Sequence, residues 1–372
     1  MGARVLKYGM VGGGAGSFIG AVHRRAIALD GQATLVAGAL SSSRERAMES
    51  ARELGLERAY GTWEEMLKGE SSRTGAERLD FVVVVTPNHA HYAPVKAFLE
   101  AGFHVVCDKP LVHTPEEADA LVKAAKARGV VLAVTYNYSG YPMVRRAAEL
   151  VASGALGTVR KAFVEYHQGW LATAIETSGQ KQASWRADPK LAGAGSLGDI
   201  GTHAENLLTM VTGKRIESLC ADVTTFVPGR RVDDDVAVLI RMNDGAKAVL
   251  TCSQVCVGCE NSLSIRVHGT EGSLAWRQEN PNVLEFTPRD GTLRMITRGG
   301  PEAGVGAKST RLPPGHPEGF HEAFANVYLG VFAKIRGEAG VFPTGEDGAR
   351  GVRFIHACLE SAKRDGAWVK VK

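Results

Sequence analysis

The first third of the chain alternates between short apolar runs and segments whose apolar residues recur with helical spacing. The apolar runs are rich in β-branched residues and lie at 5–12, 33–40, 81–85, 104–107 and 130–136. Helical patterns lie between them at 20–30, 43–54, 89–101 and 115–128. Continuous apolar strands separated by amphipathic helices are typical of a parallel sheet covered on both faces. We therefore expect an α/β protein in which residues 1–137 form a doubly wound, Rossmann-type dinucleotide-binding domain.

The pattern changes beyond residue 157, where longer strand-like runs replace the strand and helix alternation. These runs lie at 158–168, 216–227, 235–242, 246–256 and 262–268. One helical pattern interrupts them near 198–212, and the Gly-, Pro-, Arg- and Thr-rich segment 288–316 is expected to be a long loop. Strands linked by hairpin turns predict a large, mostly antiparallel sheet with one open face. We expect an α+β domain over residues 138–345 that binds the substrate and forms the oligomer contact.

The length of the chain suits this division. With 372 residues it fits two domains, at about 150 residues per domain. Helical patterns return at 317–336 and 346–364. The second pattern predicts a C-terminal helix within residues 346–372, which we expect to pack back on the Rossmann domain.

Composition and charge exclude several functional classes. Hydrophobic residues make up 44% and charged residues 23%, the proportions of a globular protein. The strongest apolar run, 81–85, is far shorter than the roughly 20 residues that cross a bilayer, and no signal-peptide pattern opens the sequence. The net charge is +4, and the positive residues are scattered. We therefore expect a cytoplasmic protein with neither a membrane nor a nucleic acid as partner.

Three cysteines, Cys252, Cys256 and Cys259, have the CxxxCxxC spacing of an iron–sulfur motif. That motif normally lies on a loop early in a barrel, whereas this copy lies late, in a segment rich in strand-forming residues. Cys252 and Cys256 are an even number of residues apart, so in a strand they share one face. We interpret them as small apolar core residues and predict no metal.

The stretch GMVGGGAGSFIGAVHR at 9–24 predicts a phosphate-binding turn, because a strand precedes it and a helix follows. Gly12 and Gly14 match the G-x-G-x-x-G fingerprint, but Ser17 stands at the third position and Gly20 replaces the glycine that packs the helix. A plain strand-to-helix turn is the alternative, and its place at the start of a β-α-β unit favours the nucleotide. The expected cofactor contacts here are Gly12, Gly13, Gly14, Ser17, Phe18 and Ile19.

The end of the second strand bears on the choice between NAD and NADP. NAD enzymes usually carry Asp or Glu there, whereas this chain has Ser41 and Ser42, followed by Arg44 and Arg46. Without the carboxylate a 2′-phosphate is not repelled, and a guanidinium such as that of Arg46 can pair with it. This pattern favours NADP, with NAD as the alternative.

Two motifs at later strand ends, TPNHAH at 86–91 and CDKP at 107–110, together with the glycine turn, resemble the glucose-fructose oxidoreductase, inositol dehydrogenase and rhizopine-catabolism (Gfo/Idh/MocA) family. The resemblance covers nearly the whole chain and implies that Lys109 lies beside substrate and nicotinamide, with Asp108 in place of the family's glutamate. It also matches Asp199 and His203 to the family's Asp-x-x-x-His element, and implies face-to-face pairing of sheets. The further cofactor contacts expected with it are Thr86, Pro87, Asn88, His91, Asp108, Lys109, Asn137, Trp185 and Arg186.

The Asp-x-x-x-His element also makes sense from its spacing alone. Asp199, His203 and Asn206 recur at i, i+4 and i+7, so an α-helix places them on one polar stripe beside an apolar face. A solvated helix face with an ordinary surface histidine is the alternative. A strand-end lysine in a nucleotide-binding fold favours the chemical interpretation.

These residues fit the needs of hydride transfer from an alcohol, which requires a base for the hydroxyl proton and a positive group near the developing oxyanion. We expect His203 to be the base, Lys109 the positive group and Asp199 the orienting carboxylate. Asn137 and His316 complete the expected substrate contacts. His89, His91 and His167 lie on separate predicted elements without ligand spacing, so no metal site with His203 is expected.

The sequence therefore predicts an NADP-preferring, or NAD-dependent, oxidoreductase acting on the CH–OH group of a sugar, polyol or sugar derivative. A redox-assisted glycoside-cleaving or epimerising enzyme and a non-enzymatic dinucleotide-sensing regulator are the alternatives. Lys109, Asp199 and His203 together argue against the sensor, which needs no base. A homodimer or homotetramer is expected, because a soluble monomer seldom exposes a large apolar sheet face.

Overall fold

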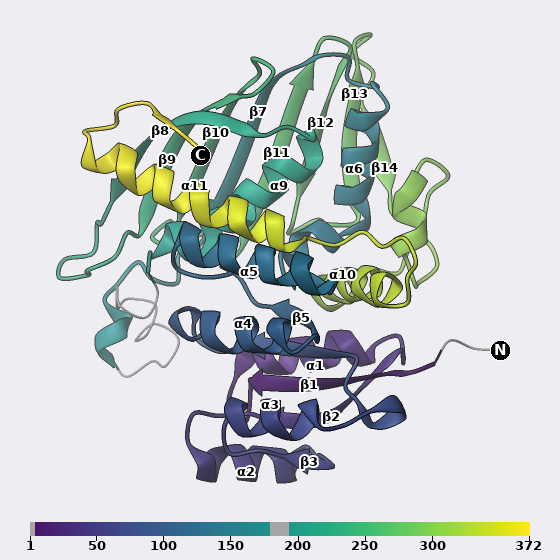
Figure 1. The fold of residues 1–372 in the computed structure, drawn as a ribbon. Coiled ribbons are helices and arrows are strands. Elements are labelled where there is room, and N and C mark those ends of the chain that lie inside the picture. Colours follow the sequence, from purple (N-terminus) through teal and green to yellow (C-terminus); the bar gives the residue numbers. More distant parts are fainter. Residues whose placement is uncertain (1–3, 179–192) are drawn as a thin grey trace. The chain divides into compact units, whose positions relative to one another are not determined.

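The computed structural model describes residues 4–178 and 193–372. The chain forms two compact units (Figure 1). The first unit comprises Met1–Tyr136 and Phe324–Ala349, and the second comprises Asn137–Ala323 and Arg350–Lys372.

The first unit is built on a six-stranded parallel sheet, and the apolar runs predict five of its strands. Its strands are β1 (Leu6–Gly12), β2 (Ala33–Ala39), β3 (Arg58–Ala59), β4 (Phe81–Val85), β5 (His104–Cys107) and β6 (Leu132–Val134), in the order β3-β2-β1-β4-β5-β6. Its connecting helices are α1 (Phe18–Ala28), α2 (Arg44–Glu53), α3 (Trp63–Ser71), α4 (Tyr92–Glu100) and α5 (Pro115–Arg128). The strand order reverses between β1 and β4, where ligands bind in open α/β sheets. The predicted Rossmann fold is confirmed.

The second unit carries a nine-stranded sheet. Its strands are β7 (Val159–His167), β8 (Ile216–Thr224), β9 (Asp235–Met242), β10 (Lys247–Ser253), β11 (Ser262–Gly269), β12 (Gly272–Arg277), β13 (Val283–Pro288), β14 (Arg294–Thr297) and β15 (Val369–Lys370), in the order β14-β13-β12-β11-β7-β10-β9-β8-β15. Among the described strands of this second sheet, only β7 and β10 pair in parallel, so its predicted, mostly antiparallel character is confirmed.

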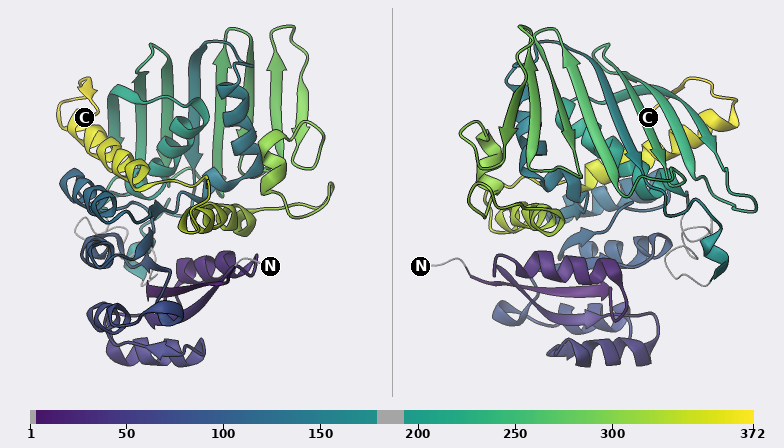
Figure 2. Two further views of the ribbon diagram at one scale, coloured as in Figure 1. Left: turned by 45° about the vertical axis from the view of Figure 1, so that its right-hand side comes forward. Right: turned by 180° about the vertical axis from the view of Figure 1, so that it is seen from behind.

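Helices lie on one face of this sheet and leave the other open (Figure 2). The covering helices include α6 (Pro142–Ala152) and α9 (Thr202–Thr212), whose buried side chains join the core of the unit. Along β9, buried and exposed side chains alternate, and Leu239 on the open face is 50% exposed. The open face is therefore a mixed surface with apolar positions in it.

Several elements differ from the sequence-based expectation. The two-residue strand β3 was not expected, and neither were β12, β13 and β14, the last of which lies within the segment predicted as a loop. Strand β10 ends at Ser253, so the interpretation of the cysteines is right for buried Cys252 and wrong for Cys256, which lies beyond the strand. The turn-like composition of residues 288–316 gave no signal for β14, because strand formation there depends on pairing with β13 rather than on intrinsic propensity.

The two C-terminal helices belong largely to different units from those expected. Helix α10 (Phe320–Ile335) supplies Phe324, Tyr328 and Phe332 to the first unit, where the Phe324 ring lies edge-on to His23 and the Phe332 ring lies tilted against Phe81. Residues of α11 (Gly345–Lys363) from Arg350 onward, and β15 after it, belong to the second unit, where β15 pairs with β8. The cause is general, since helical spacing reveals that a helix has a buried face but not which sheet covers it.

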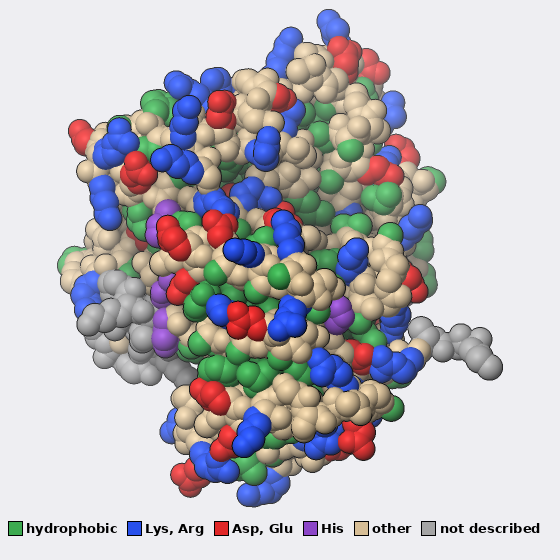
Figure 3. All heavy atoms as spheres, in the orientation of Figure 1, with side chains coloured by type: hydrophobic (Ala, Val, Ile, Leu, Met, Phe, Trp, Pro, Cys, Tyr) green, Lys and Arg blue, Asp and Glu red, His purple; other side chains and the backbone are tan. Residues whose placement is uncertain are grey.

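Within residues 4–178 and 193–372, no helix has the length and apolar character needed to cross a membrane. Over the face drawn in Figure 3, Lys and Arg side chains are interspersed with Asp and Glu side chains. The described residues on that face form no continuous basic band.

Candidate active site

The glycine turn between β1 and α1 requires glycine at several positions. Gly12 and Gly13 have φ values of 77° and 74°, in the left-handed region that favours glycine. A Cβ on Gly14 would lie 2.6 Å from the Leu40 carbonyl oxygen, and a Cβ on Gly20 would lie 2.4 Å from the Gly13 Cα. The turn thus lies against the end of β2, and α1 lies against the turn. Gly20 therefore allows the helix to pack against the turn, which is the role that the sequence analysis gave it in place of the fingerprint's third glycine.

Helix α1 begins directly after this turn. Ser17 is its N-cap residue, and the Ser17 hydroxyl accepts a hydrogen bond from the Gly20 N–H at 3.2 Å. Phe18 is 66% exposed and Ile19 is half-buried. No acidic residue occupies the first turn of α1, so no negative charge there opposes an anion. The turn and the helix start are suited to a phosphate group.

The end of β2 holds the residues that bear on the adenosine ribose. Ser41 is half-buried, and its hydroxyl accepts from the Ser43 N–H at 3.2 Å. Arg44 forms an ion pair with Glu65 at 2.5 Å. Arg46 is exposed, and its guanidinium has no ion pair among the described residues, while Ser42 is exposed beside it. Arg46 can therefore bind a ligand phosphate without breaking an ion pair, whereas Arg44 would have to leave Glu65.

His91 joins the loops that follow β4 and β5. Its ring is fully buried, with Nε2 2.9 Å from the Thr86 carbonyl oxygen and Nδ1 3.0 Å from that of Pro110. Burial lowers the pKa of His91, and the charge of Asp108 opposes that effect. The predicted contacts Thr86, Pro87 and Asn88 lie on the β4 loop, at the start of a 3-10 turn over Asn88–Ala90. His91 thus holds these loops through their backbone.

Asp108 and Lys109 follow β5 at the carboxyl edge of the sheet. The Thr135 hydroxyl donates to the Asp108 carboxylate at 2.6 Å, and His23 Nε2 lies 3.8 Å from it. Burial alone would raise the pKa of Asp108, but His23, Lys109 and Thr135 together outweigh it and hold that pKa below its usual range. Asp108 is therefore ionised at neutral pH beside half-buried Lys109.

Sequence reasoning missed the partners of Asp108. His23 lies on the buried face of α1, and its Nδ1 is 2.5 Å from the hydroxyl of Tyr328 on α10. The two residues are 305 positions apart, so no local spacing connects them. A histidine on an apolar helix face was the one available signal.

Asp199 and His203 lie where the helix of the second unit begins. The segment Leu197–Gly201, which contains Asp199, is a single π-helical turn, and α9 follows from Thr202. His203 is 7% exposed and Asn206 is 4% exposed, so the solvated helix face weighed as an alternative is absent. The i, i+4 spacing predicted an ordinary α-helix; the π-turn differs, and such turns occur frequently at functional sites.

We call Asp199 and His203 the dyad. Five polar residues form a hydrogen-bonded set beside it, and we call this set the amide–tyrosine network: Tyr138, Tyr166, Gln168, Gln254 and Asn261. Its connecting bonds run from Gln254 to Gln168 (3.3 Å), from Gln168 to Asn261 (2.8 Å), from Tyr166 to Asn261 (2.8 Å) and from Asn261 to Tyr138 (3.2 Å). The Gln254 amide also donates to the Asp199 carboxylate at 2.9 Å. Asp199 is therefore held at one of its oxygens.

Aromatic rings of the same network surround His203. The Tyr138 ring lies edge-on at 4.9 Å between centroids, and the Tyr166 ring lies at 6.3 Å. Burial raises the pKa of both Tyr138 and Tyr166, with the charge of Asp199 acting in the same direction. Both hydroxyls thus stay protonated at neutral pH. The sequence predicted the dyad but none of the five network residues, because these lie on four separate segments.

Asp233 fixes the segment that leads into the π-turn. Its carboxylate accepts from the N–H groups of Gly195 and Leu197, both at 2.7 Å, and from the Ser196 hydroxyl at 2.9 Å. A Cβ on Gly195 would lie 1.9 Å from the Asp233 carbonyl oxygen, so this close approach needs glycine. Burial raises the pKa of Asp233, and these three donors act against that rise.

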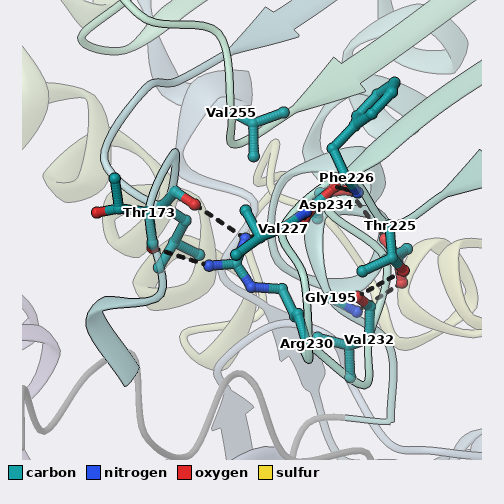
Figure 4. A network of polar contacts seen from close by, with 12 residues as sticks. Thr173, Gly195, Thr225, Phe226, Val227, Arg230, Val232, Asp234 and Val255 are labelled. Carbon is teal, nitrogen blue, oxygen red and sulfur yellow. Dashed lines mark hydrogen bonds and ion pairs between the residues drawn. The ribbon is translucent and has the colours of Figure 1, made fainter. Parts of the chain in front are cut away.

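The neighbouring Asp234 fixes a second loop (Figure 4). It accepts from the Phe226 and Val227 N–H groups and pairs with Arg230 at 3.0 Å. Arg230 is almost fully buried and also donates to the Thr173 carbonyl oxygen at 3.1 Å, a contact drawn in Figure 4. Two adjacent aspartates thus anchor the segment that precedes Asp199 and the loop that follows β8.

The remaining predicted site residues have different settings. Asn137 is 3% exposed at the start of a 3-10 turn, and its Nδ2 has no hydrogen-bond partner among the described residues. His316 is exposed, with Nδ1 3.3 Å from the Pro314 carbonyl oxygen. Trp185 and Arg186 lie outside the described residues. In the part of the chain that the structure describes, no three His, Cys, Asp or Glu side chains are grouped to hold a metal ion.

Comparison with known proteins places both units in one family. Residues 6–136 match the oxidoreductase family with an NAD-binding Rossmann fold, and residues 144–275 match the GFO/IDH/MocA C-terminal domain. The chain belongs to the Gfo/Idh/MocA oxidoreductase family. The family resemblance found in the sequence is confirmed.

Three relatives cover nearly the full chain. An oxidoreductase from Sinorhizobium meliloti is 45% identical, with a TM-score of 0.91 over 99% of this chain and 100% of its own. An inositol dehydrogenase homologue from Azotobacter vinelandii, solved with NADH and myo-inositol, is 34% identical, with a TM-score of 0.90 over 99% and 98%. Levoglucosan dehydrogenase from Pseudarthrobacter phenanthrenivorans is 28% identical over 98% of each chain. A structure of levoglucosan dehydrogenase with NADH and levoglucosan has a TM-score of 0.86 at 28% identity, over 99% of this chain and 100% of its own.

Proposed function

We propose that this protein transfers a hydride between a nicotinamide dinucleotide and the CH–OH group of a sugar, polyol or sugar derivative. The observation that carries the proposal is the pair of half-buried Asp199 and buried His203, which the amide–tyrosine network contacts through Gln254 and Tyr138. The ionised Asp108 beside Lys109 at the edge of the Rossmann sheet supports it. So do the relatives solved with NADH and myo-inositol and with NADH and levoglucosan.

The residues present fit a dinucleotide. A side chain at Gly12 or Gly13 would need a rare backbone conformation, and one at Gly20 would collide with the turn, so the backbone is kept open to a phosphate. When bound, the nicotinamide supplies the hydride acceptor. The proposed cofactor contacts are Gly12, Gly13, Gly14, Ser17, Phe18, Ile19, Ser41, Ser42, Arg46, Thr86, Pro87, Asn88, Asp108, Lys109, Asn137, Trp185 and Arg186. His91 is proposed to act through the loops that it holds.

In the oxidation direction, His203 takes the hydroxyl proton while the carbinol C–H bond gives up its hydride and the C–O bond becomes a carbonyl. Lys109 stabilises the negative charge that develops on the oxygen. Asp199 orients a substrate hydroxyl or the histidine, with its other oxygen held by Gln254. Asn137, with its amide nitrogen lacking a partner among the described residues, and exposed His316 are proposed as further substrate contacts.

We propose NADP as the preferred cofactor, with NAD as the alternative. No carboxylate stands at Ser41 to repel a 2′-phosphate, and Arg46 has no ion pair among the described side chains. Arg44 is committed to Glu65, which narrows the expected phosphate partner to Arg46. We further propose a cytoplasmic homodimer or homotetramer that buries the open sheet face.

A substrate screen tests the proposed function. Monosaccharides, polyols such as myo-inositol, and anhydrosugars such as levoglucosan are each incubated with NAD and NADP, and the absorbance of the reduced nicotinamide is followed. We expect reduction with at least one of them and a carbonyl product by mass spectrometry. Cleaved or epimerised product without net cofactor reduction would instead indicate the redox-assisted alternative. Dinucleotide binding with no turnover of any compound would contradict an enzyme of this class.

A further inference from the structure

The turn that follows β10 carries two cysteines that the proposed reaction does not use. Cys256 and Cys259 are both free and half-buried, and they flank Val257 and Gly258. The Cys259 N–H donates to the Cys256 carbonyl oxygen at 3.1 Å, which closes a β-turn. Gly258 has a φ of 94°, as the third residue of a type II turn requires.

This turn brings the two cysteines within bridging range. The first and fourth Cα atoms of a β-turn lie within about 7 Å, and disulfides span Cα separations of about 4.4–6.8 Å. The apex is open to reagents, since Val257 is 84% exposed. The remaining cysteines differ, because Cys107, Cys252 and Cys358 are buried and half-buried Cys220 lies on β8.

The same turn is bonded to the amide–tyrosine network. The Cys256 N–H donates to the Gln168 carbonyl oxygen at 2.9 Å, and the Gly169 N–H donates to the Cys259 carbonyl oxygen at 2.8 Å. A Cβ on Gly169 would lie 2.7 Å from the Cys256 carbonyl oxygen, so the turn and the end of β7 are in close contact. Gln168 in turn contacts Gln254, which holds Asp199. Two side-chain contacts, between Gln168 and Gln254 and between Gln254 and Asp199, therefore connect the cysteine turn to the dyad.

We propose that Cys256 and Cys259 form a dithiol modification site that small disulfides oxidise to an intramolecular disulfide. The thiolate of one cysteine attacks a small disulfide such as oxidised glutathione and displaces one thiol. The second cysteine then attacks the mixed disulfide and displaces the other thiol. The chain loses two electrons and two protons, and the small disulfide becomes two thiols. In a reducing compartment the dithiol is the resting form.

Thiol chemistry tests the site without any substrate. The full chain is treated with oxidised glutathione, and its free thiols and mass are measured, with the disulfide mapped by peptide mass spectrometry. We expect the wild type to lose the Cys256 and Cys259 thiols without retaining glutathione. C256S and C259S should each retain one glutathione on the remaining cysteine, and C220S should behave as the wild type does. Stable glutathione on both cysteines of the wild type, or unreacted thiols at both, would overturn the proposal.

The link to the dyad rests on the proposed function and is measured separately. With whichever substrate the screen returns, oxidation should raise KM at least about fivefold, equivalent to roughly one lost hydrogen bond. The dinucleotide affinity should not change. C256S/C259S should show the kinetics of the reduced wild type and no response to oxidised glutathione. A mapped disulfide with unchanged KM would overturn the link, whereas a chain without turnover that still forms the disulfide would refute only the proposed function.

Discussion

The glycine turn of the first unit and the amide–tyrosine network of the second are built in opposite ways. The turn is made by backbone within one short stretch of sequence, and at Gly14 and Gly20 even a Cβ would collide. The network is made by side chains from four segments, joined by hydrogen bonds of 2.8–3.3 Å. A backbone site restricts each position to one residue type, whereas a side-chain site depends on long-range packing. This difference predicts separable defects in binding and in chemistry.

The largest effect is expected at the dyad. His203→Ala and Asp199→Asn should each lower turnover by roughly a hundred to ten thousand fold, since a positioned acid or base contributes about that much. Dinucleotide affinity, measured by fluorescence, should stay at the wild-type value. His268→Ala, at an exposed histidine on β11, serves as the control. Near-normal turnover in both dyad variants would remove His203 and Asp199 from the proposed chemistry.

Cofactor choice tests dinucleotide binding, the other function in the comparison. Ser41→Asp combined with Arg46→Ala should shift the ratio of kcat/KM for NADP over NAD by about ten to a hundred fold, because a charge-assisted contact is lost and a carboxylate opposes the phosphate. Arg44→Ala is the matched control, since Arg44 already pairs with Glu65. An unchanged ratio in the double variant would place these residues away from the ribose.

Asp108 gives a pH-dependent stability prediction for the first unit. The pKa of Asp108 lies below the usual range in the folded protein. Its contribution to the free energy of unfolding is therefore fully present above the pKa of about 3.9 in the unfolded chain, and is lost as the pH falls below that value. Asp108→Asn should therefore lower the free energy of unfolding by about 1–3 kcal/mol at neutral pH. This difference in free energy of unfolding between the wild type and Asp108→Asn should become smaller as the pH falls below about 4. Urea unfolding over a pH series measures it, with exposed Glu45→Gln as control. A difference that is constant with pH would contradict the ionised state.

The smallest effect concerns assembly. The open face of the nine-stranded sheet includes Leu239, half exposed on β9. If this face joins copies of the chain, Leu239→Lys should weaken association by about tenfold, because burying an unpaired charge is costly. Sedimentation of the wild type as a dimer or tetramer at micromolar concentration is the reference. A monomeric wild type would refute the interface outright.

The comparison also explains what the sequence could and could not predict. The strand, glycine turn and start of α1 were predictable because their signals are adjacent residues. Gln254 and Asn261 were not predictable, because nothing in a glutamine or asparagine next to a strand end points to Asp199 or Tyr166. His23 belongs to the same class, since its partner Tyr328 is 305 residues away. The placement of α10 and α11 failed for a related reason, because a helix pattern does not identify the sheet that it covers.

The proposed function centres on a carbinol hydride that moves to the nicotinamide while Lys109 stabilises the oxygen. Lys109→Met keeps an unbranched apolar stem of nearly the same length and removes the charge. The direct measurement uses substrate deuterated at the carbinol carbon, saturating dinucleotide confirmed by fluorescence, and mass spectrometry of the reduced cofactor. We expect one deuterium in the nicotinamide for the wild type, and deuteride transfer by Lys109→Met at less than about one-hundredth of the wild-type rate. Reduced cofactor without deuterium, or transfer by Lys109→Met within about tenfold of the wild type, would contradict it.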